Sequence, residues 1–118
     1  MTRLEREGKL VRIFIGEGDR HGGRPLYEAI VHAAREMGLA GATVLRGVAG
    51  FGARSLVHTA RLLRLSEDLP IVIEVVEVPE RIEAFVAAVE RMLDEANCGG
   101  LITVERAEVI RYSPDSRR

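Results

Sequence analysis

A glycine-flanked phenylalanine is the feature of this sequence most suited to holding, or changing shape around, a small molecule. Gly50-Phe51-Gly52 places glycines on both sides of the aromatic residue. Glycine adopts backbone angles that other residues avoid, so a loop that begins with such a triplet can change conformation at low cost. We expect Gly50, Phe51 and Gly52 to form the base of a functional loop. The alternative is a plain turn whose phenylalanine fills the core.

His21, two glycines and Arg24 directly precede an expected helix. Backbone N–H groups and the dipole at a helix N-terminus favour a bound anion, and Arg24 adds positive charge. We therefore predict an anion site at His21 and Arg24. The alternative is a solvated loop that only starts the helix.

The candidate metal ligands are three histidines and one cysteine: His21, His32, His58 and Cys98. No two of them have the close spacing that is typical of a metal site, so we predict none. Cys98 follows an expected helix, and the negative end of a helix dipole disfavours a reactive thiolate. The sequence also contains no recognisable pair of nucleophile and base, so we predict a protein that is not an enzyme.

Composition excludes several classes of partner. The formal net charge of −1 gives no field that would attract nucleic acid, and the two tyrosines and three phenylalanines show no stacking pattern. A single cysteine excludes an internal disulfide and suits a reducing compartment. The charged N-terminus is unlike a signal peptide, and no apolar run approaches the roughly 18 residues of a membrane span. We expect a cytoplasmic protein that neither binds nucleic acid nor inserts into a membrane.

The pattern of apolar residues predicts four strands and two helices. Runs of β-branched residues indicate the strands, and apolar residues spaced three and four apart indicate the helices. Pro25 and Pro79 suit first helical turns, and Gly38 suits a helix end. The expected strands are 9–16, 42–48, 71–78 and 101–112, and the expected helices are 25–37 and 79–96.

This order, β-α-β-β-α-β, is that of the ferredoxin-like fold, an α+β arrangement in which a four-stranded antiparallel sheet carries two helices on one face. We expect residues 1–118 to form a single domain with frayed ends at 1–7 and 113–118. Residues 49–69 are expected to form a long loop between the second and third strands, in which 55–63 fits a short helix or a returning strand. The face without helices has more valine, isoleucine and leucine than a solvated face needs, so we expect a homo-oligomer to bury it.

Five segments follow one another as they do in PII-like signalling proteins: 33–44, 50–54, 69–76, 78–82 and 107–111. The second of them, Gly50-Phe51-Gly52-Ala53-Arg54, resembles the opening of the long T-loop in that family. The stretch from His21 to Glu28 resembles an uncharacterised branch of the family, a domain of unknown function. The chain as a whole therefore resembles a PII-like protein of this branch.

The resemblance implies a homotrimer whose intersubunit clefts bind a small effector, often an adenine nucleotide. It also implies that residues 49–69 act as a T-loop that docks on a target, commonly a membrane transporter or a metabolic enzyme. The implied ligand-binding residues are Gly41, Ala42 and Thr43 at the nucleotide base, Gly50, Phe51 and Gly52 at the T-loop base, Gly99 and Gly100 at a phosphate-binding turn, and Arg111 at the phosphates. From the residues alone, Arg111 either binds such a ligand or pairs with a neighbouring glutamate.

Two cations of the family's phosphate site are missing here. The turn Asn97-Cys98-Gly99-Gly100-Leu101 contains no lysine, and Ser113 stands where the family has a second arginine. Each missing charge-assisted hydrogen bond removes roughly 1.5–3 kcal/mol of interaction. The identity of the ligand stays open, but a nucleoside monophosphate or a small anion is favoured over ATP.

We therefore expect a non-enzymatic regulatory or sensor protein that binds a small effector between subunits and docks on a partner through its loop. Two alternatives share the architecture. One is a metal-binding trimer similar to the CutA proteins. The other is a small acylphosphatase-like hydrolase, in which Arg24 would hold the phosphate.

Overall fold

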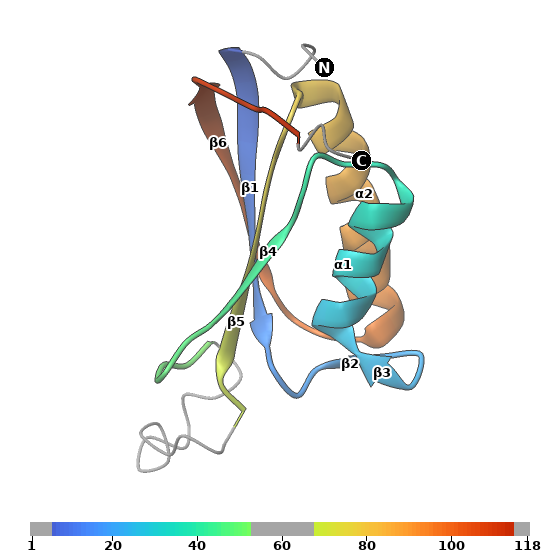
Figure 1. Ribbon diagram of the computed structural model, residues 1–118. Coiled ribbons are helices and arrows are strands. Elements are labelled where there is room, and N and C mark those ends of the chain that lie inside the picture. Colours follow the sequence, from blue (N-terminus) through green and yellow to red (C-terminus); the bar gives the residue numbers. More distant parts are fainter. Residues whose placement is uncertain (1–5, 53–67, 115–118) are drawn as a thin grey trace.

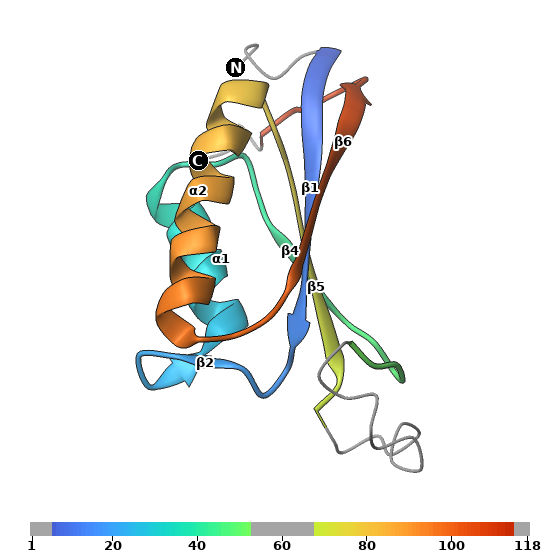
Figure 2. The same cartoon turned by 180° about the vertical axis from the view of Figure 1, so that it is seen from behind.

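Both helices pack on one face of a four-stranded antiparallel sheet, and no described residue covers the other face (Figures 1 and 2). The computed structural model describes residues 6–52 and 68–114. Within these residues the expected βαββαβ order and the ferredoxin-like arrangement are confirmed. One small element was not expected. It is a two-stranded hairpin of β2 (Arg20–His21) and β3 (Arg24–Pro25), inserted before the first helix.

The sheet has the strand order β4-β5-β1-β6, and each neighbouring pair is antiparallel. β1 and β5 are therefore the inner strands, whereas β4 and β6 form the two edges. The remaining elements are β1 (Arg6–Gly16), α1 (Leu26–Glu36), β4 (Thr43–Arg46), β5 (Pro70–Glu77), α2 (Pro79–Ala96) and β6 (Leu101–Val109).

The second expected strand is shorter than predicted. β4 has four residues instead of spanning 42–48, and its last pair joins Arg46 to Ile71. The next residue of β5 is Pro70, which has no N–H to continue the ladder. Its carbonyl oxygen accepts one hydrogen bond from the Gly47 N–H at 2.8 Å, and the pairing ends there. The last strand also ends early, at Val109 instead of 112.

Helix ends lie close to the predicted positions. Pro79 is the first residue of α2. Pro25 stands one position before α1, because its ψ of 135° is extended and not helical. Gly38 follows the end of α1 with a φ of +72°, the left-handed conformation that glycine adopts without strain. Within the described part of the chain, no helix is long and apolar enough to cross a membrane.

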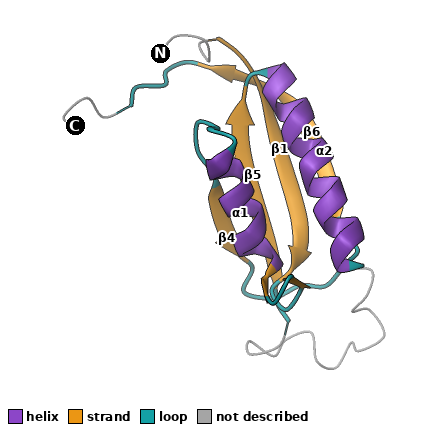
Figure 3. Ribbon diagram, turned by 90° about the vertical axis from the view of Figure 1, so that its right-hand side faces the viewer, coloured by secondary structure: helices purple, strands orange, loops and turns teal. Residues whose placement is uncertain are grey.

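The core lies between the sheet and the helices. Alternate residues of β1 and β5 point toward the helices and are buried, as the two-residue period of a strand requires. Each helix adds the apolar stripe that its spacing predicts. Figure 3 shows both helices lying against the sheet. The core cluster consists of Val11, Ile13, Ile15, Leu26, Ile30, Ala34, Ile71, Ile73, Val75, Ile82, Phe85, Val89 and Leu93.

Candidate functional site

The loop that leads from α1 into β4 contains Gly41, Ala42 and Thr43, all exposed at an edge of the sheet. A methyl group added to Gly41 would meet no atom within 4 Å, so a flat ligand can approach the backbone there closely. Thr43 begins β4 opposite Glu74 of β5. The three residues are accessible, and their contact with a nucleotide base stays a prediction.

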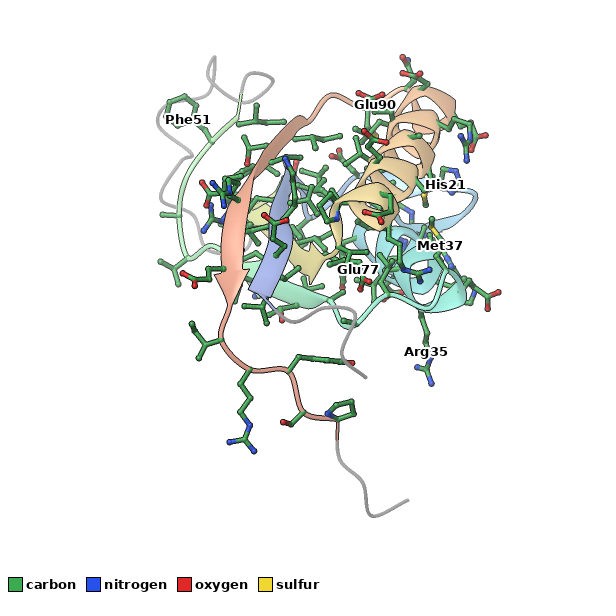
Figure 4. The ribbon with its side chains drawn as sticks, turned by 90° about the horizontal axis from the view of Figure 1, so that it is seen from above. His21, Arg35, Met37, Phe51, Glu77 and Glu90 are labelled. Atoms are coloured by element: carbon green, nitrogen blue, oxygen red, sulfur yellow. The ribbon has the colours of Figure 1, made fainter. Side chains whose placement is uncertain are left out.

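A buried carboxylate at the end of β5 holds this loop. Glu77 is 0% exposed, and its Oε1 accepts a hydrogen bond from the Ala40 N–H at 2.8 Å. Its Oε2 lies 3.2 Å from Nε of Arg81, in the first turn of α2. Arg81 also donates a hydrogen bond from Nη2 to the Met37 carbonyl oxygen. Figure 4 shows Glu77 and Met37 on the side of the sheet that carries the helices.

Sequence reasoning missed this junction. Glu74 and Glu77 lie three positions apart on one strand and therefore on opposite faces of the sheet, but the sequence analysis assigned no role to either. The signal was present: a glutamate closes an apolar strand and an arginine follows four positions later. A carboxylate buried among valines must find a cation or hydrogen-bond donors, because an unpaired buried charge is very costly.

The predicted loop base packs against the start of β5. Methyl groups added to Gly47 and Gly50 would lie 2.9 and 3.1 Å from Cγ of Pro70, so only glycines allow this close approach. Gly50 also has a φ of +146°. Phe51 is 54% exposed and projects away from the sheet and helices (Figure 4), so the alternative in which it fills the core is wrong. Residues 53–67, with the predictions for 55–63 and His58, lie outside the described residues.

The predicted phosphate turn lies where α2 meets β6. Asn97 ends the helix with a φ of +55°, and Gly99 and Gly100 follow. An open depression of about 530 Å³ is lined by Glu90, Leu93, Asp94, Cys98, Gly99, Gly100 and Ile102. Among the described residues that line it, Glu90 and Asp94 are acidic and none is basic. One chain alone therefore offers a poor site for a highly charged phosphate.

Arg111 lies beyond the end of β6 and is exposed. Its Nε donates a hydrogen bond to Oγ of Ser113 at 2.9 Å. Among the described residues it pairs with no glutamate, which leaves its guanidinium available to a ligand. Its role at a phosphate stays a prediction.

The β2–β3 hairpin carries the predicted anion site. Gly22 and Gly23 have φ values of +59° and +86°, which form the tight two-residue turn between the strands. Nε2 of His21 lies 2.9 Å from Oε1 of Glu95 on α2, whereas Arg24 is exposed. The neighbouring carboxylate makes His21 a poorer anion ligand than Arg24, and the anion site stays a prediction.

The predicted ligand residues fall into two groups at opposite edges of the sheet. Gly41–Thr43 and Gly50–Gly52 stand at the two ends of β4, whereas Gly99 and Gly100 precede β6 and Arg111 follows it, roughly 30 Å away along the nine residues of that strand. Two strands lie between these edges, which places them about 14 Å apart. One chain does not bring the two groups together. A ligand that contacts both edges either spans this width or lies where the β4 edge of one chain meets the β6 edge of another.

The described residues contain no group of three or more histidine, cysteine, aspartate or glutamate side chains that could hold a metal ion. His21 faces Glu95, and His32 lies 3.6 Å from Glu36, one turn away on the same helix. Each of these two histidines thus lies beside a single carboxylate.

Comparisons with solved structures confirm the fold. The chain is similar to CPII, a nitrogen regulatory PII-like protein from Thiomonas intermedia K12, in a structure bound to ADP and bicarbonate. The TM-score is 0.64 at 17% sequence identity, over 89% of this chain and 90% of CPII. A second CPII structure, with ADP, AMP and bicarbonate, gives a TM-score of 0.64 at 16% identity, again over 89% and 90% of the two chains.

Two relatives are closer in sequence. A UPF0166 protein of Aquifex aeolicus is 37% identical over 102 residues, which cover 86% of this chain and 92% of the relative. The UPF0166 protein MJ1524 of Methanocaldococcus jannaschii is 30% identical over 105 residues, or 89% and 94% of the two chains. The sequence profile of the family DUF190, described as Uncharacterized ACR, COG1993, matches residues 8–109. The protein is a member of the DUF190 family, and its fold is that of the PII-like proteins.

Proposed function

We propose that this protein is a non-enzymatic, PII-like regulator that binds a small effector between the subunits of a homotrimer. The division of the candidate ligand residues between two sheet edges carries this proposal. Residues at the two edges lie about 14 Å apart in one chain, and an assembly that places the β4 edge of one chain beside the β6 edge of another would bring them to one ligand. The sheet face without helices and the two edge strands are accessible to a second chain.

For the effector we propose an adenine nucleotide, with a monophosphate favoured over ATP. The ligands in CPII, which include ADP and AMP, support the nucleotide class. The acidic residues Glu90 and Asp94 beside Gly99 and Gly100 support the lower phosphate charge, because each carboxylate repels a phosphate group. Arg111 would be the main cation at the phosphate, supplied by a different subunit from the one that supplies Gly99 and Gly100, because β6 separates these residues within one chain.

For the partner we propose a membrane transporter or a metabolic enzyme in the cytoplasm, bound through residues 49–69. Phe51, near the start of this segment, is 54% exposed, and Val48, directly before it, is 78% exposed. Large apolar side chains that protrude together from a surface are typical of a docking site.

The experiment combines native mass spectrometry of the unstripped protein with titration calorimetry of AMP, ADP and ATP. We expect a trimer that binds AMP more tightly than ATP. Arg111→Ala should weaken AMP binding by at least tenfold, which corresponds to one charge-assisted hydrogen bond. Arg106→Ala is the matched control, because this exposed arginine of β6 only approaches Glu7, at 3.8 Å. A stable monomer would contradict the proposal.

The two alternative functions have less support. The described histidines lie apart and form no metal-binding group with other side chains of the described part of the chain. Arg24 lies in an exposed two-stranded hairpin and not in a loop that encloses a phosphate. Uptake of zinc or copper by dialysed protein would favour the metal-binding trimer. Turnover of acyl phosphates that Arg24→Ala abolishes would favour the hydrolase.

A further inference from the structure

The turn that follows β1, residues 16–19, binds the chain segment that leads into β5. The Glu17 N–H donates a hydrogen bond to the Leu69 carbonyl oxygen at 2.8 Å. The next N–H, that of Gly18, donates to Oδ1 of Asp68. Asp68 lies 50 positions from Gly18 in the sequence, so these two bonds fix the start of β5 to a distant turn.

Two glycines of this turn leave the space that the Asp68 carboxylate occupies. A Cβ on Gly16 would lie 2.8 Å from Oδ2 and 2.9 Å from Oδ1 of Asp68, and a Cβ on Gly18 would lie 3.3 Å from Oδ1. Neither glycine has a positive φ, so the backbone angles do not call for glycine here. The close approach of the carboxylate is therefore the reason for glycine at both positions.

The 16–19 turn is well suited to hold another segment because it is itself held at both ends. The Gly16 N–H donates to Oδ2 of Asp19 at 3.0 Å, and the Asp19 N–H donates to the Gly16 carbonyl oxygen at 3.2 Å. The Asp19 carbonyl oxygen accepts a hydrogen bond from the N–H of Leu26, the first residue of α1, at 2.8 Å. The turn is thus fixed between β1 and α1.

Pro70 connects this anchored segment to the predicted loop base. Its ring packs against Gly47 and Gly50, and its carbonyl oxygen accepts the Gly47 N–H at 2.8 Å. A second link runs from the end of β4 to the same turn, where Nη1 of Arg46 lies 3.0 Å from Oε2 of Glu17. The end of β1, the end of β4 and the start of β5 lie together at the lower end of the sheet in Figure 1.

The contribution of Asp68 is local. Asp68 is exposed, whereas Leu69 beside it is 4% exposed and belongs to the core. Substitutions at exposed positions usually change the free energy of unfolding little. The Asp68 carboxylate therefore affects where the start of β5 lies more than whether the chain folds.

We propose that Asp68 is a positioning residue for the effector site: its carboxylate, bound in the 16–19 turn, sets the position of residues 50–52 through Pro70. This inference rests on the proposed function, in which residues 50–52 contact the effector. A glycine-rich loop base has many accessible conformations. A ligand that fits one of them binds more weakly the less that conformation is populated. The hydrogen bond of Asp68 raises the population of the conformation that binds.

The test is titration calorimetry of AMP with the full chain. Asp68→Ala should weaken AMP binding about tenfold, as expected for one charge-assisted hydrogen bond. Loss of a negative charge would by itself strengthen the binding of an anion, so weaker binding separates positioning from a charge effect. Asp68→Asn keeps an oxygen acceptor for the Gly18 N–H and should stay within about threefold of the parental affinity. Both variants should keep the thermal midpoint within about 4 °C of the parent.

Gly16→Ala tests the same contact from the other side. Its Cβ would lie 2.8 Å from the Asp68 carboxylate and displace it, so AMP binding should again weaken about tenfold. Both changes break one contact, so the double variant Gly16→Ala with Asp68→Ala should bind AMP no more weakly than either alone. Glu36→Ala is the control, because it removes one negative charge from an exposed residue of α1 that pairs with His32 on the same helix. It should keep the parental affinity.

Amide hydrogen exchange of the ligand-free protein gives a readout that does not depend on AMP. The Gly47 N–H, which is bonded to the Pro70 carbonyl oxygen, should exchange about tenfold faster in Asp68→Ala than in the parent. The same exchange rate in Asp68→Asn should stay close to that of the parent.

The outcomes separate this inference from the proposed function. A parent that binds none of AMP, ADP and ATP would overturn both. A parent that binds AMP while Asp68→Ala or Gly16→Ala binds it equally well would overturn the inference alone. Parental exchange of the Gly47 N–H in Asp68→Ala would do the same, and so would additive losses in the double variant. An Asp68→Asn variant as weak as Asp68→Ala would also overturn it, because the hydrogen bond to Gly18 would then not be the cause.

Discussion

Replacing the buried Glu77 by alanine should lower the free energy of unfolding more than replacing any exposed carboxylate among the described residues by alanine. The substitution removes the acceptor of the Ala40 N–H at 2.8 Å and the carboxylate 3.2 Å from Nε of Arg81. Breaking a buried ion pair costs about 3–5 kcal/mol. The side chain of Arg81 is 35% exposed and can reach water, so we reduce this to about 2 kcal/mol. The lost hydrogen bond of Ala40 adds about 1 kcal/mol.

The expected total is therefore about 3 kcal/mol of unfolding free energy. A chain of 118 residues has a stability of roughly 6–18 kcal/mol, so the variant should remain folded. Urea unfolding followed by circular dichroism measures the loss, at one protein concentration because association would contribute. Amide hydrogen exchange adds a local readout, because the Ala40 N–H should lose its protection.

The matched control is Glu17→Ala. Glu17 pairs with Arg46 at 3.0 Å, but its side chain is 33% exposed and that of Arg46 57% exposed. Such a pair contributes about 0–1 kcal/mol. If Glu77→Ala costs no more than Glu17→Ala, or if Ala40 keeps its protection, the inferred anchoring of the α1–β4 loop by Glu77 is refuted.

Three other substitutions test neighbouring features. Arg81→Met should cost about 3–5 kcal/mol, measured by urea unfolding, because it leaves the fully buried Glu77 without its cation; a loss smaller than that of Glu77→Ala would contradict this. Gly50→Val should lower the thermal midpoint by about 4–8 °C, because the φ of Gly50 is +146° and the new Cβ would lie 3.1 Å from Cγ of Pro70. Gly52→Val is the control and should change the midpoint little, because no atom lies within 4 Å of its Cβ. Gly41→Val should leave stability unchanged within about 0.5 kcal/mol, because no atom lies within 4 Å of its Cβ. It should nevertheless abolish AMP binding in calorimetry, and unchanged binding would remove Gly41 from the proposed site.

Most of the fold could be predicted because local patterns specify it. Alternating apolar residues place Val11, Ile13 and Ile15 on one face of β1, and helical spacing places Ile82, Phe85 and Val89 on one face of α2. Pro79 and Gly38 mark helix ends through their own backbone preferences. These effects act within a few residues, so they can be read along the chain.

The ends of the strands were predicted less well, because they depend on the paired strand. β4 stops at Arg46 since Pro70, 24 positions later in the chain, has no N–H to offer. The hairpin of β2 and β3 was overlooked for another reason: its strands have two residues each, too few for a period to appear.

The sequence by itself determined the two helices, the four strands of the sheet in their ferredoxin-like order, and the list of glycines and cations suited to a ligand. Only the tertiary structure decided how these residues are distributed, because strand order is set by long-range pairing. It separated Gly41 from Gly99 by the width of the sheet and joined Glu77 to Ala40 across 37 positions. It also aligned Arg12 with Glu74 and Glu105 on the sheet face without helices. Register and burial are properties of the packed chain, so no local pattern contains them.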